Sequence, residues 1–422
     1  MINPTPAFAS FDHRLSGESK APIGVAFSGG GDSLMALKIT IAWAFPRGRS
    51  VIAFHVDHRL QAASPGWAAA ARASADRLGA GFVALAWSGD KPATGLAAAA
   101  RIARHRLIAE AAREAGVRVL VFGHTADDQI EAVLMRDAGH RMGALREWSP
   151  SPVWPEGRGL FVLRPLLGAR RAAIREALAA EGETWIDDPA NTDPRSPRAR
   201  ARPTAAAIDP LDVGAEADDR LAELASQARV GPGGDIRIDR DALRTAPRAS
   251  ARRLVGAAAA CAGGSGSTPR GERLEALMDR LLGHGAISAT LSGAKIAADR
   301  DVLFTRNAGE ASRGGLSPLQ LGARGAGVWD GRFEIAAGSA SVTILALAGH
   351  AARLDRAEHR ALKALPASVR PGLPTSLDAD GRATCAILAG PGLAETGPIG
   401  VKPLVAARFL AAGGVISKEP AT

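Results

Sequence analysis

The chain has 422 residues, 46% hydrophobic and 23% charged, a globular composition long enough for two or three domains. Its formal net charge of +9 favours a polyanionic partner such as RNA, although an arginine- and alanine-rich composition alone also makes a protein basic. Its two cysteines form no CxxC pair, which argues against a zinc ribbon or an iron–sulfur site, and its apolar runs are shorter than the ~20 residues that span a bilayer, so we expect a cytoplasmic protein without a membrane partner.

The first half of the chain alternates short apolar runs with helical stretches. Strands are expected at 23–27, 51–56, 82–87 and 117–122, and helices at 32–45, 68–78, 96–115 and 126–136. This alternation is typical of an α/β domain with a parallel sheet and helices on both faces. Three polar clusters, at 28–33, 57–58 and 124–128, follow strands directly. Because ligands bind at the carboxyl ends of such strands, we expect the clusters to share one site.

The remainder is less regular. A helix is expected through 174–180, residues 185–202 are dense in turn-forming residues, and a boundary is expected at 203–210. Beyond it we expect a mainly helical region at 211–283, a hairpin at 289–305 and short β-strands in the last hundred residues. This pattern predicts three domains, an N-terminal α/β domain followed by helical and mixed α+β C-terminal regions, at 1–205, 206–310 and 311–422.

The sharpest motif lies between the first expected strand and helix and reads Ser28-Gly29-Gly30-Gly31-Asp32-Ser33. Glycines let the backbone approach phosphate oxygens, the N–H groups at a helix start bind anions, and the serines add hydroxyl donors. Asp32 suits a cation such as Mg²⁺ beside those phosphates. The loop lacks the Lys-Ser/Thr pair of a Walker A motif and is not GxGxxG. The competing interpretation is an ordinary glycine-rich turn.

A second motif covers 123–131. His124 at a strand end can reach a phosphate or a leaving oxygen, and Asp127 and Asp128 lie in the first turn of a helix, where carboxylates cap N–H groups. Both acids could be caps. Because two caps at one terminus are redundant, we expect Asp127 to be the cap and Asp128 to hold an amine or a metal.

Two basic segments complete the candidates. Arg101 and Arg104 are spaced i,i+3 on one helix face, which suits a nucleotide phosphate or an RNA backbone, and a solvated basic face is the alternative. The arginines at 198, 200 and 202 form a strip that can bind RNA phosphates.

Together these motifs resemble the tRNA(Ile)-lysidine synthase family of the PP-loop ATP pyrophosphatases. The resemblance runs from Ile23 to about Arg202 and rests on an SGGxDS-like loop at 28–33, a VDH segment at 56–58, an AR-x-x-RY-like helix at 100–107, a GHxxDDQxET-like segment at 123–132 and an RPLL…DPSN-like run at 164–193. Residues 136–145 depart from the family's glycine-rich stretch, and His105 replaces its Tyr.

The resemblance implies a PP-loop ATPase, adenine nucleotide alpha hydrolase-like fold for 1–205, with 206–310 binding tRNA. It implies ATP and Mg²⁺ as cofactors, and tRNA(Ile) with a CAU anticodon and free L-lysine as partners. Cytidine at the first anticodon position would be adenylated, and lysine would displace AMP at C2 to give lysidine. The implied residues are Ser28, Gly29, Gly30, Gly31, Asp32 and Ser33 for ATP, Asp32 for the metal, Asp32, Arg101, His124 and Asp128 for catalysis, and Arg104, Arg198, Arg200 and Arg202 for tRNA.

Three alternatives stay open. Another PP-loop enzyme, either a tRNA thiolase or an amidating ligase, would share the nucleotide loop. Thiolases generally need a cysteine near the site, and none precedes Cys261. A non-catalytic tRNA-binding protein with a decayed ATP site is the third alternative, and the intact 28–33 loop speaks against it. The sequence leaves a homodimer open.

Overall fold

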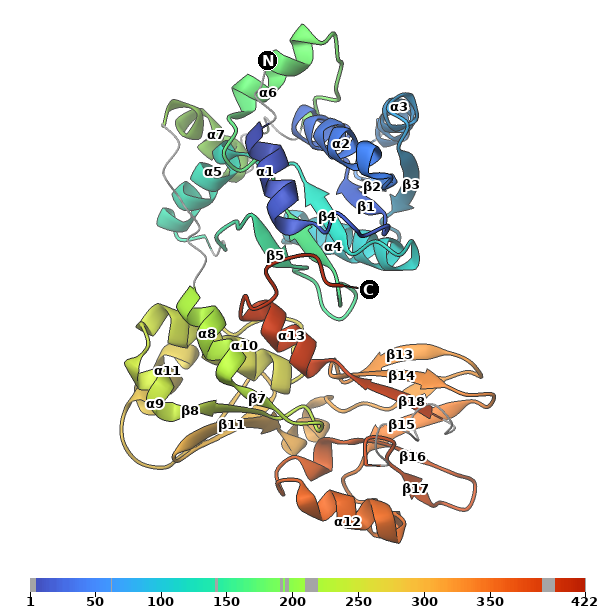
Figure 1. Ribbon diagram of the computed structural model, residues 1–422, viewed down its shortest axis with the longest axis vertical. Helices are drawn as coiled ribbons and strands as arrows, with labels where there is room; N and C mark the ends of the chain where they lie inside the picture. The colour runs from blue at the N-terminus through green and yellow to red at the C-terminus, as the bar shows by residue number, and fades with distance from the viewer. Residues whose placement is uncertain are drawn as a thin grey trace. The chain divides into compact units, whose positions relative to one another are not determined.

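The computed structural model describes residues 5–61, 63–140, 143–189, 193, 197–208, 219–388 and 399–421 (Figure 1). The chain forms two compact units. Unit 1 comprises Met1–Glu216 together with Ile416–Thr422, and unit 2 comprises Ala217–Val415. Within the described residues, no helix is both long enough and apolar enough to cross a membrane.

Unit 1 is built on a six-stranded sheet of order β3-β2-β1-β4-β6-β5. Its strands are β1 (Ile23–Ala26), β2 (Val51–Asp57), β3 (Gly81–Ala86), β4 (Val119–Phe122), β5 (Trp148–Pro150) and β6 (Phe161–Leu163). All neighbours pair in parallel except β5, which lies antiparallel at the edge. The strand order reverses between β1 and β4, which is where an open α/β sheet forms its ligand crevice.

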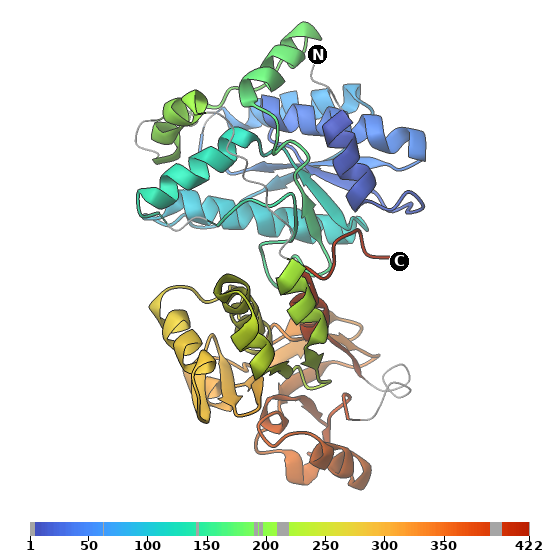
Figure 2. The ribbon, with the colours of Figure 1, turned by 60° about the vertical axis from the view of Figure 1, so that its left-hand side comes forward.

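Helices cover both faces of this sheet, as the sequence predicted (Figure 2). One face packs against α1 (Thr5–Arg14), α2 (Gly31–Ala44), α3 (Ser64–Arg77) and α6 (Arg171–Ala180), and the other against α4 (Leu96–Glu114). The strands supply both layers by alternation. In β4, Val119 and Val121 face α2, whereas Leu120 and Phe122 face α4.

Two further helices pack against each other, α5 (Ala126–Asp137) and α7 (Pro197–Ala207). Helix α7 corrects the expectation of turns up to 202 and a boundary starting at 203, because it is continuous and contains Pro203. Its arginines form ion pairs with carboxylates of α5, a tertiary interaction that local turn propensity does not report. Elsewhere the expected strands and helices of 23–136 lie within a few residues of the observed ones.

The C-terminal segment of unit 1 is anchored by a buried ion pair that the sequence did not indicate. Arg49 follows the short 3₁₀ helix η1 (Phe45–Arg47), and its guanidinium contacts both carboxylate oxygens of Glu419, each at 2.8 Å. Neither side chain is exposed. Glu419 also accepts from the Ser16 amide at 3.0 Å, and the Trp148 indole donates to the Ile416 carbonyl at 2.9 Å. We call Arg49, Glu419 and these contacts the tail clasp.

Unit 2 combines helices with three antiparallel sheets. Helices α8 (Asp219–Gln227), α9 (Arg240–Thr245), α10 (Arg248–Ala262), α11 (Glu272–Leu282) and α13 (Val405–Ala412) share a core with the sheet β7-β8-β11-β10-β9. This sheet contains β7 (Arg229–Val230), β8 (Ile236–Asp239), β9 (Ile287–Leu291), β10 (Ala294–Ala298) and β11 (Asp301–Arg306). The expected hairpin at 289–305 is therefore part of a three-strand meander.

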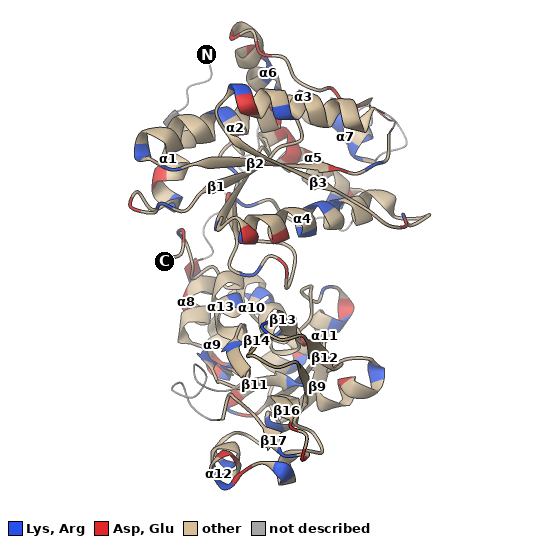
Figure 3. Ribbon diagram, turned by 90° about the vertical axis from the view of Figure 1, so that its right-hand side faces the viewer, with Lys and Arg blue, Asp and Glu red and all other residues tan. Residues whose placement is uncertain are grey.

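The other two sheets have the orders β12-β15-β16-β17 and β13-β14-β18. They comprise β12 (Leu319–Leu321), β13 (Ala326–Trp329), β14 (Phe333–Ala337), β15 (Val342–Ala346), β16 (Pro374–Leu377), β17 (Ala383–Thr384) and β18 (Ile399–Pro403), with α12 (Arg356–Ala364) and the 3₁₀ helices η3 (Ala308–Arg313), η4 (Ala351–Arg353) and η5 (Arg370–Gly372). Lys and Arg occur on both units (Figure 3). The three domains expected from the sequence stay a prediction.

Candidate active site

The glycine-rich loop links β1 to α2 at the carboxyl edge of the sheet. Gly29 has φ +85°, and a Cβ there would lie 2.4 Å from Ile186 Cδ1, so both backbone and space require glycine. Ser33 Oγ donates to the Gly30 carbonyl at 2.8 Å and accepts from the Ser28 amide at 3.2 Å. The N-cap residue of α2 is Gly30, and no side chain caps the helix. The first N–H groups of α2 are therefore suited to an anion.

The segment after β4 lies directly against this loop. A Cβ on Gly123 would lie 2.4 Å from the Asp32 carbonyl oxygen, so the glycine allows the two backbones to touch. His124 follows and is buried, with its ring stacked on Phe122 at 5.7 Å between centroids. The two strand ends that the sequence predicted to share a site are thus adjacent.

His124 is held as a neutral imidazole. Arg164 Nε donates to His124 Nδ1 at 3.2 Å, which makes Nδ1 the acceptor and leaves the proton on Nε2. Burial lowers the pKa of His124 to about 3, with Asp128 opposing this effect and Arg164 reinforcing it. His124 can therefore donate a hydrogen bond from Nε2 to a developing negative charge without being a cation itself.

The acid that caps the start of α5 is Asp128, and not Asp127 as we had expected. Asp128 Oδ2 accepts from the Thr125 amide at 2.7 Å and from the Thr125 hydroxyl at 3.0 Å, which closes a capping box. Asp127 instead accepts from the Arg171 amide at 2.7 Å. The cap is thus Asp128, because a capping box uses the third helical residue. Its second oxygen, Oδ1, is free of the cap and contacts arginines.

An arginine–carboxylate cluster connects α2, α5, α6 and α7. Arg171 contacts Asp32 at 3.0 Å, Asp128 at 3.3 Å and Glu131 at 3.0 Å. Arg198 contacts Asp128 and also Glu131, the latter at 2.7 Å. Burial alone would raise the pKa of Asp128, but Arg198 and Arg171 outweigh it and keep that pKa below its usual value. Asp128 is therefore a carboxylate at neutral pH.

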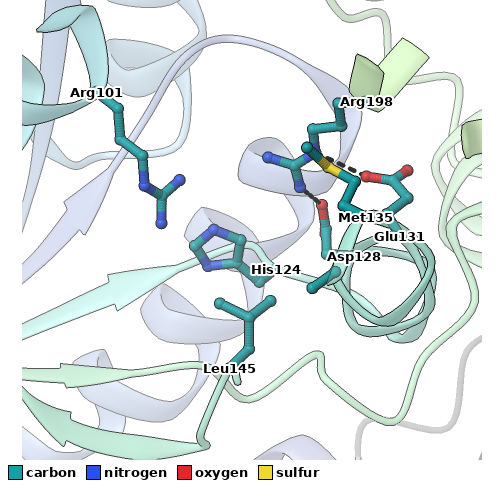
Figure 4. Close-up of a pocket in the computed structure, with 8 residues that line it drawn as sticks. Arg101, His124, Asp128, Glu131, Met135, Leu145 and Arg198 are labelled. Atoms are coloured by element: carbon teal, nitrogen blue, oxygen red, sulfur yellow. Dashed lines mark hydrogen bonds and ion pairs between the residues drawn. The ribbon is translucent and has the colours of Figure 1, made fainter. Parts of the chain in front are cut away.

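A pocket opens beside this cluster (Figure 4). It is lined by Arg101, His124, Asp128, Glu131, Ala132, Met135, Leu145 and Arg198. The Arg101 guanidinium points toward His124 from the opposite side to Arg198 (Figure 4). No carboxylate of the described residues forms an ion pair with Arg101 or Arg104, and burial lowers the pKa of Arg104 to about 10. These two cations are suited to an anion from outside the described residues, such as a phosphate.

Asp32 suits a cation bound together with phosphates. One of its oxygens accepts from Arg171 at 3.0 Å, whereas Oδ1 is buried without a partner among the described residues. Burial raises the pKa of Asp32, and Arg171 partly offsets this. Among all the residues that the structure describes, no group of three or more His, Cys, Asp or Glu side chains could hold a metal ion. Mg²⁺ would need only this carboxylate plus phosphate and water oxygens, so the residues fit such an ion.

The structure brings most sequence candidates to one place. The 28–33 loop and Asp32 lie beside the His124 segment, Asp128, Arg101 and Arg198 line the pocket, and Arg202 contacts Glu131 at 3.5 Å. Arg200 is exposed, because only residues spaced i,i+4 on α7 face α5.

Sequence reasoning did not assign roles to Glu131, Arg164 and Arg171. Glu131 was detectable, because it is spaced i,i+3 from Asp128 on one helix and thus shares its face. Arg164 and Arg171 are distant in sequence from the residues they contact, and no local pattern pairs them with His124 or Asp32.

The comparisons with known proteins agree with this geometry. Residues 5–206 match the family model of the PP-loop domain, so unit 1 is of the PP-loop ATP-utilising class. A tRNA(Ile)-lysidine synthase of Caulobacter vibrioides is 48% identical over 415 residues, 98% of this chain and 98% of that protein. Enzymes of the same name from Hyphomonas neptunium and Mesorhizobium japonicum are 35% and 36% identical, over 66% and 76% of this chain and 79% and 73% of theirs.

The chain belongs to the tRNA(Ile)-lysidine synthase family. This confirms the family and the fold class that the sequence predicted, and with them an enzyme that uses ATP through a PP-loop domain.

Proposed function

We propose that the protein uses ATP and Mg²⁺ to activate cytidine at the first anticodon position of tRNA(Ile) with a CAU anticodon, and joins free L-lysine to its C2, giving lysidine. The observation that carries this proposal is the chemical composition of the pocket. One end carries the acids Asp128 and Glu131, the wall is apolar, and the opposite side presents Arg101, which pairs with no carboxylate of the described residues.

These three features match the three parts of lysine. Asp128 and Glu131 would accept hydrogen bonds from the ammonium group, and Arg101 would bind the carboxylate. The aliphatic chain fits against Ala132, Met135 and Leu145. A thiolase or an ammonia-dependent ligase would have no use for this combination of an acidic end and an apolar wall.

The residues around the pocket then have distinct tasks. The 28–33 loop would bind the phosphates of ATP, and Asp32 would hold Mg²⁺, which when bound would supply positive charge beside those phosphates. His124 Nε2–H stabilises charge that develops during transfer. Asp128 orients the amine, and Arg104 supplies a positive charge for phosphate or RNA.

The cysteines give a further reason to prefer this function over tRNA thiolation. Cys261 and Cys385 both belong to unit 2 and are buried. Burial raises the pKa of Cys261 to about 11 and that of Cys385 to about 12, so neither is a reactive thiolate at neutral pH. A homodimer and a cytoplasmic location stay predictions of the sequence, to be checked by sedimentation and cell fractionation.

Two variants separate activation from lysine transfer. Pyrophosphate release and lysine incorporation are measured with Mg²⁺, lysine, and tRNA(Ile) carrying CAU or UAU. Asp32→Asn should lose both signals, because the metal is lost. Asp128→Asn should keep pyrophosphate release and lose incorporation about 100-fold, because only the amine is misplaced.

Asp12→Asn is the matched control, since Asp12 is an ion-paired acid of α1 that binds Arg47 at 3.1 Å. It should behave like the wild type. Incorporation that does not require CAU would contradict the proposed substrate. Pyrophosphate release without any lysine incorporation in the wild type would assign the pocket to a different amine.

A further inference from the structure

The amine site that we assign to lysine is filled by a side chain of the protein itself. The Arg198 guanidinium contacts Asp128 Oδ1, the oxygen that the capping box leaves free, and its Nε reaches Glu131 at 2.7 Å (Figure 4). A guanidinium and an ammonium are both cations that donate hydrogen bonds to carboxylates. Arg198 therefore stands where the ammonium of lysine would bind.

Charge balance makes the two occupants mutually exclusive. Among the described residues, the ion pairs of the cluster join four carboxylates to four guanidiniums: Asp32, Asp127, Asp128 and Glu131 with Arg170, Arg171, Arg198 and Arg202. Arg101 and Arg104 add two positive charges beside it. An ammonium bound at Asp128 and Glu131 would compete with Arg198 for the same carboxylate oxygens, in a partly desolvated site that already carries more cations than carboxylates, so one guanidinium must leave when lysine binds.

Arg198 is the guanidinium best placed to leave. Its side chain is 35% exposed, compared with 16% for Arg171, which also holds three carboxylates. Arg198 lies on α7, where Arg200 is exposed to solvent. It is thus at the boundary between the pocket and solvent, within reach of the phosphate of a large polyanion.

We infer that Arg198 is an internal cation that occupies the amine site until a phosphate of bound RNA withdraws it, so that lysine binds after tRNA. This inference rests on the proposed function. The positive charges of Arg101 and Arg104 favour the same order, because a site that carries surplus cations attracts an anion before another cation. Lysine is then admitted only when its acceptor is present.

The inference predicts a thermodynamic coupling that needs no catalysis. Lysine affinity is measured by calorimetry without ATP, in the absence and presence of saturating CAU-bearing tRNA(Ile). In the wild type, tRNA should tighten lysine binding about tenfold, and lysine should tighten tRNA binding by the same factor. In Arg198→Ala the lysine site is already vacant, so lysine should bind tightly with and without tRNA.

The matched control is Arg47→Ala, because the Arg47 side chain is 37% exposed and pairs with Asp12, away from the cluster. It should keep the wild-type coupling. Equal lysine affinity with and without tRNA in the wild type would overturn the inference, as would weaker lysine binding by Arg198→Ala without tRNA. The reciprocal wild-type measurement tests the coupling without any variant. If lysine bound neither the wild type nor Arg198→Ala, with or without tRNA, the proposed function would be overturned, and this inference with it.

Discussion

Unit 1 contains two arginine–carboxylate clusters that differ in how completely their charges are matched. In the tail clasp, Arg49 and Glu419 meet through two hydrogen bonds of 2.8 Å, and the remaining donors of Arg49 reach carbonyls such as that of Ala21 at 2.9 Å. In the pocket cluster, Glu131 is shared by Arg171, Arg198 and Arg202, and Arg101 and Arg104 pair with no carboxylate of the described residues.

This difference in charge matching indicates that the tail clasp stabilises the fold, whereas the pocket cluster binds a ligand. A fully satisfied buried pair contributes to a unique fold and has no group left for a ligand. A cluster with unpaired cations and an orphaned carboxylate oxygen, such as Asp32 Oδ1, is costly to the apo protein and becomes satisfied only when a substrate supplies the missing charges. The comparison therefore predicts opposite responses to mutation in two places with the same chemistry.

The largest effect on stability is expected at the tail clasp. Glu419→Ala leaves the Arg49 guanidinium buried without a countercharge, which should cost about 3–5 kcal/mol. Thermal and urea unfolding of unit 1 would measure this loss. Glu181→Ala is the control, because its side chain is 48% exposed beside Lys38, and a surface pair contributes no more than about 1 kcal/mol. Similar losses in both variants would show that the clasp is not a structural element.

A smaller effect, one that depends on pH, is expected from His105 beside the pocket. Burial, helped by Arg104, lowers the pKa of His105 to about 2, whereas the unfolded value is near 6.5. Above pH 6.5 both states are neutral and stability is complete. As the pH falls below 6.5, only the unfolded chain takes up the proton, so stability is lost, by about 2 kcal/mol between pH 6.5 and pH 5.

His105→Phe should remove this part of the pH dependence, because Phe cannot titrate and can keep the stacking on Phe122. Unfolding curves at pH 7, 6 and 5 would show a flatter dependence than the wild type. The Glu419→Ala variant is the comparison, since it keeps His105 and should keep the wild-type slope below pH 6.5. An unchanged slope in His105→Phe would mean that His105 takes up its proton at the same pH in the folded and the unfolded protein.

Local features of the sequence were predicted correctly, whereas long-range ion pairs were missed. Alternating apolar runs with polar residues at their carboxyl ends predicted the parallel sheet and placed the Asp32 loop beside His124, because strand ends and helix starts are local features. The tail clasp was missed because Arg49 and Glu419 are 370 residues apart and neither lies in a recognisable motif. Long-range ion pairs carry no periodic signal.

Within the site, the missed contacts have the same origin. Asp128 was expected to be free for an amine or a metal because Asp127 was expected to be the cap, and only the Thr125 geometry decides between them. Arg171 joins Asp32 across 139 residues, and Glu131 receives arginines from two other helices. The sequence therefore predicted where the site lies, but the ion pairs that position its residues depend on tertiary packing.

The smallest effect is the one that tests the comparison most directly. Arg101→Met removes a partly buried cation that pairs with no carboxylate of the described residues and is repelled by Arg198, and replaces it with an apolar chain of similar length. Unit 1 should become more stable by about 1 kcal/mol, a rise of roughly 2–4 °C in Tm, while lysine incorporation falls about 100-fold because the carboxylate contact is lost. Arg49→Met is the matched substitution, and it should lose several kcal/mol because it leaves Glu419 buried and unpaired. If Arg101→Met also lowered the stability of unit 1, Arg101 would stabilise the protein without substrate. The contrast between a satisfied clasp and an unsatisfied pocket would then be wrong.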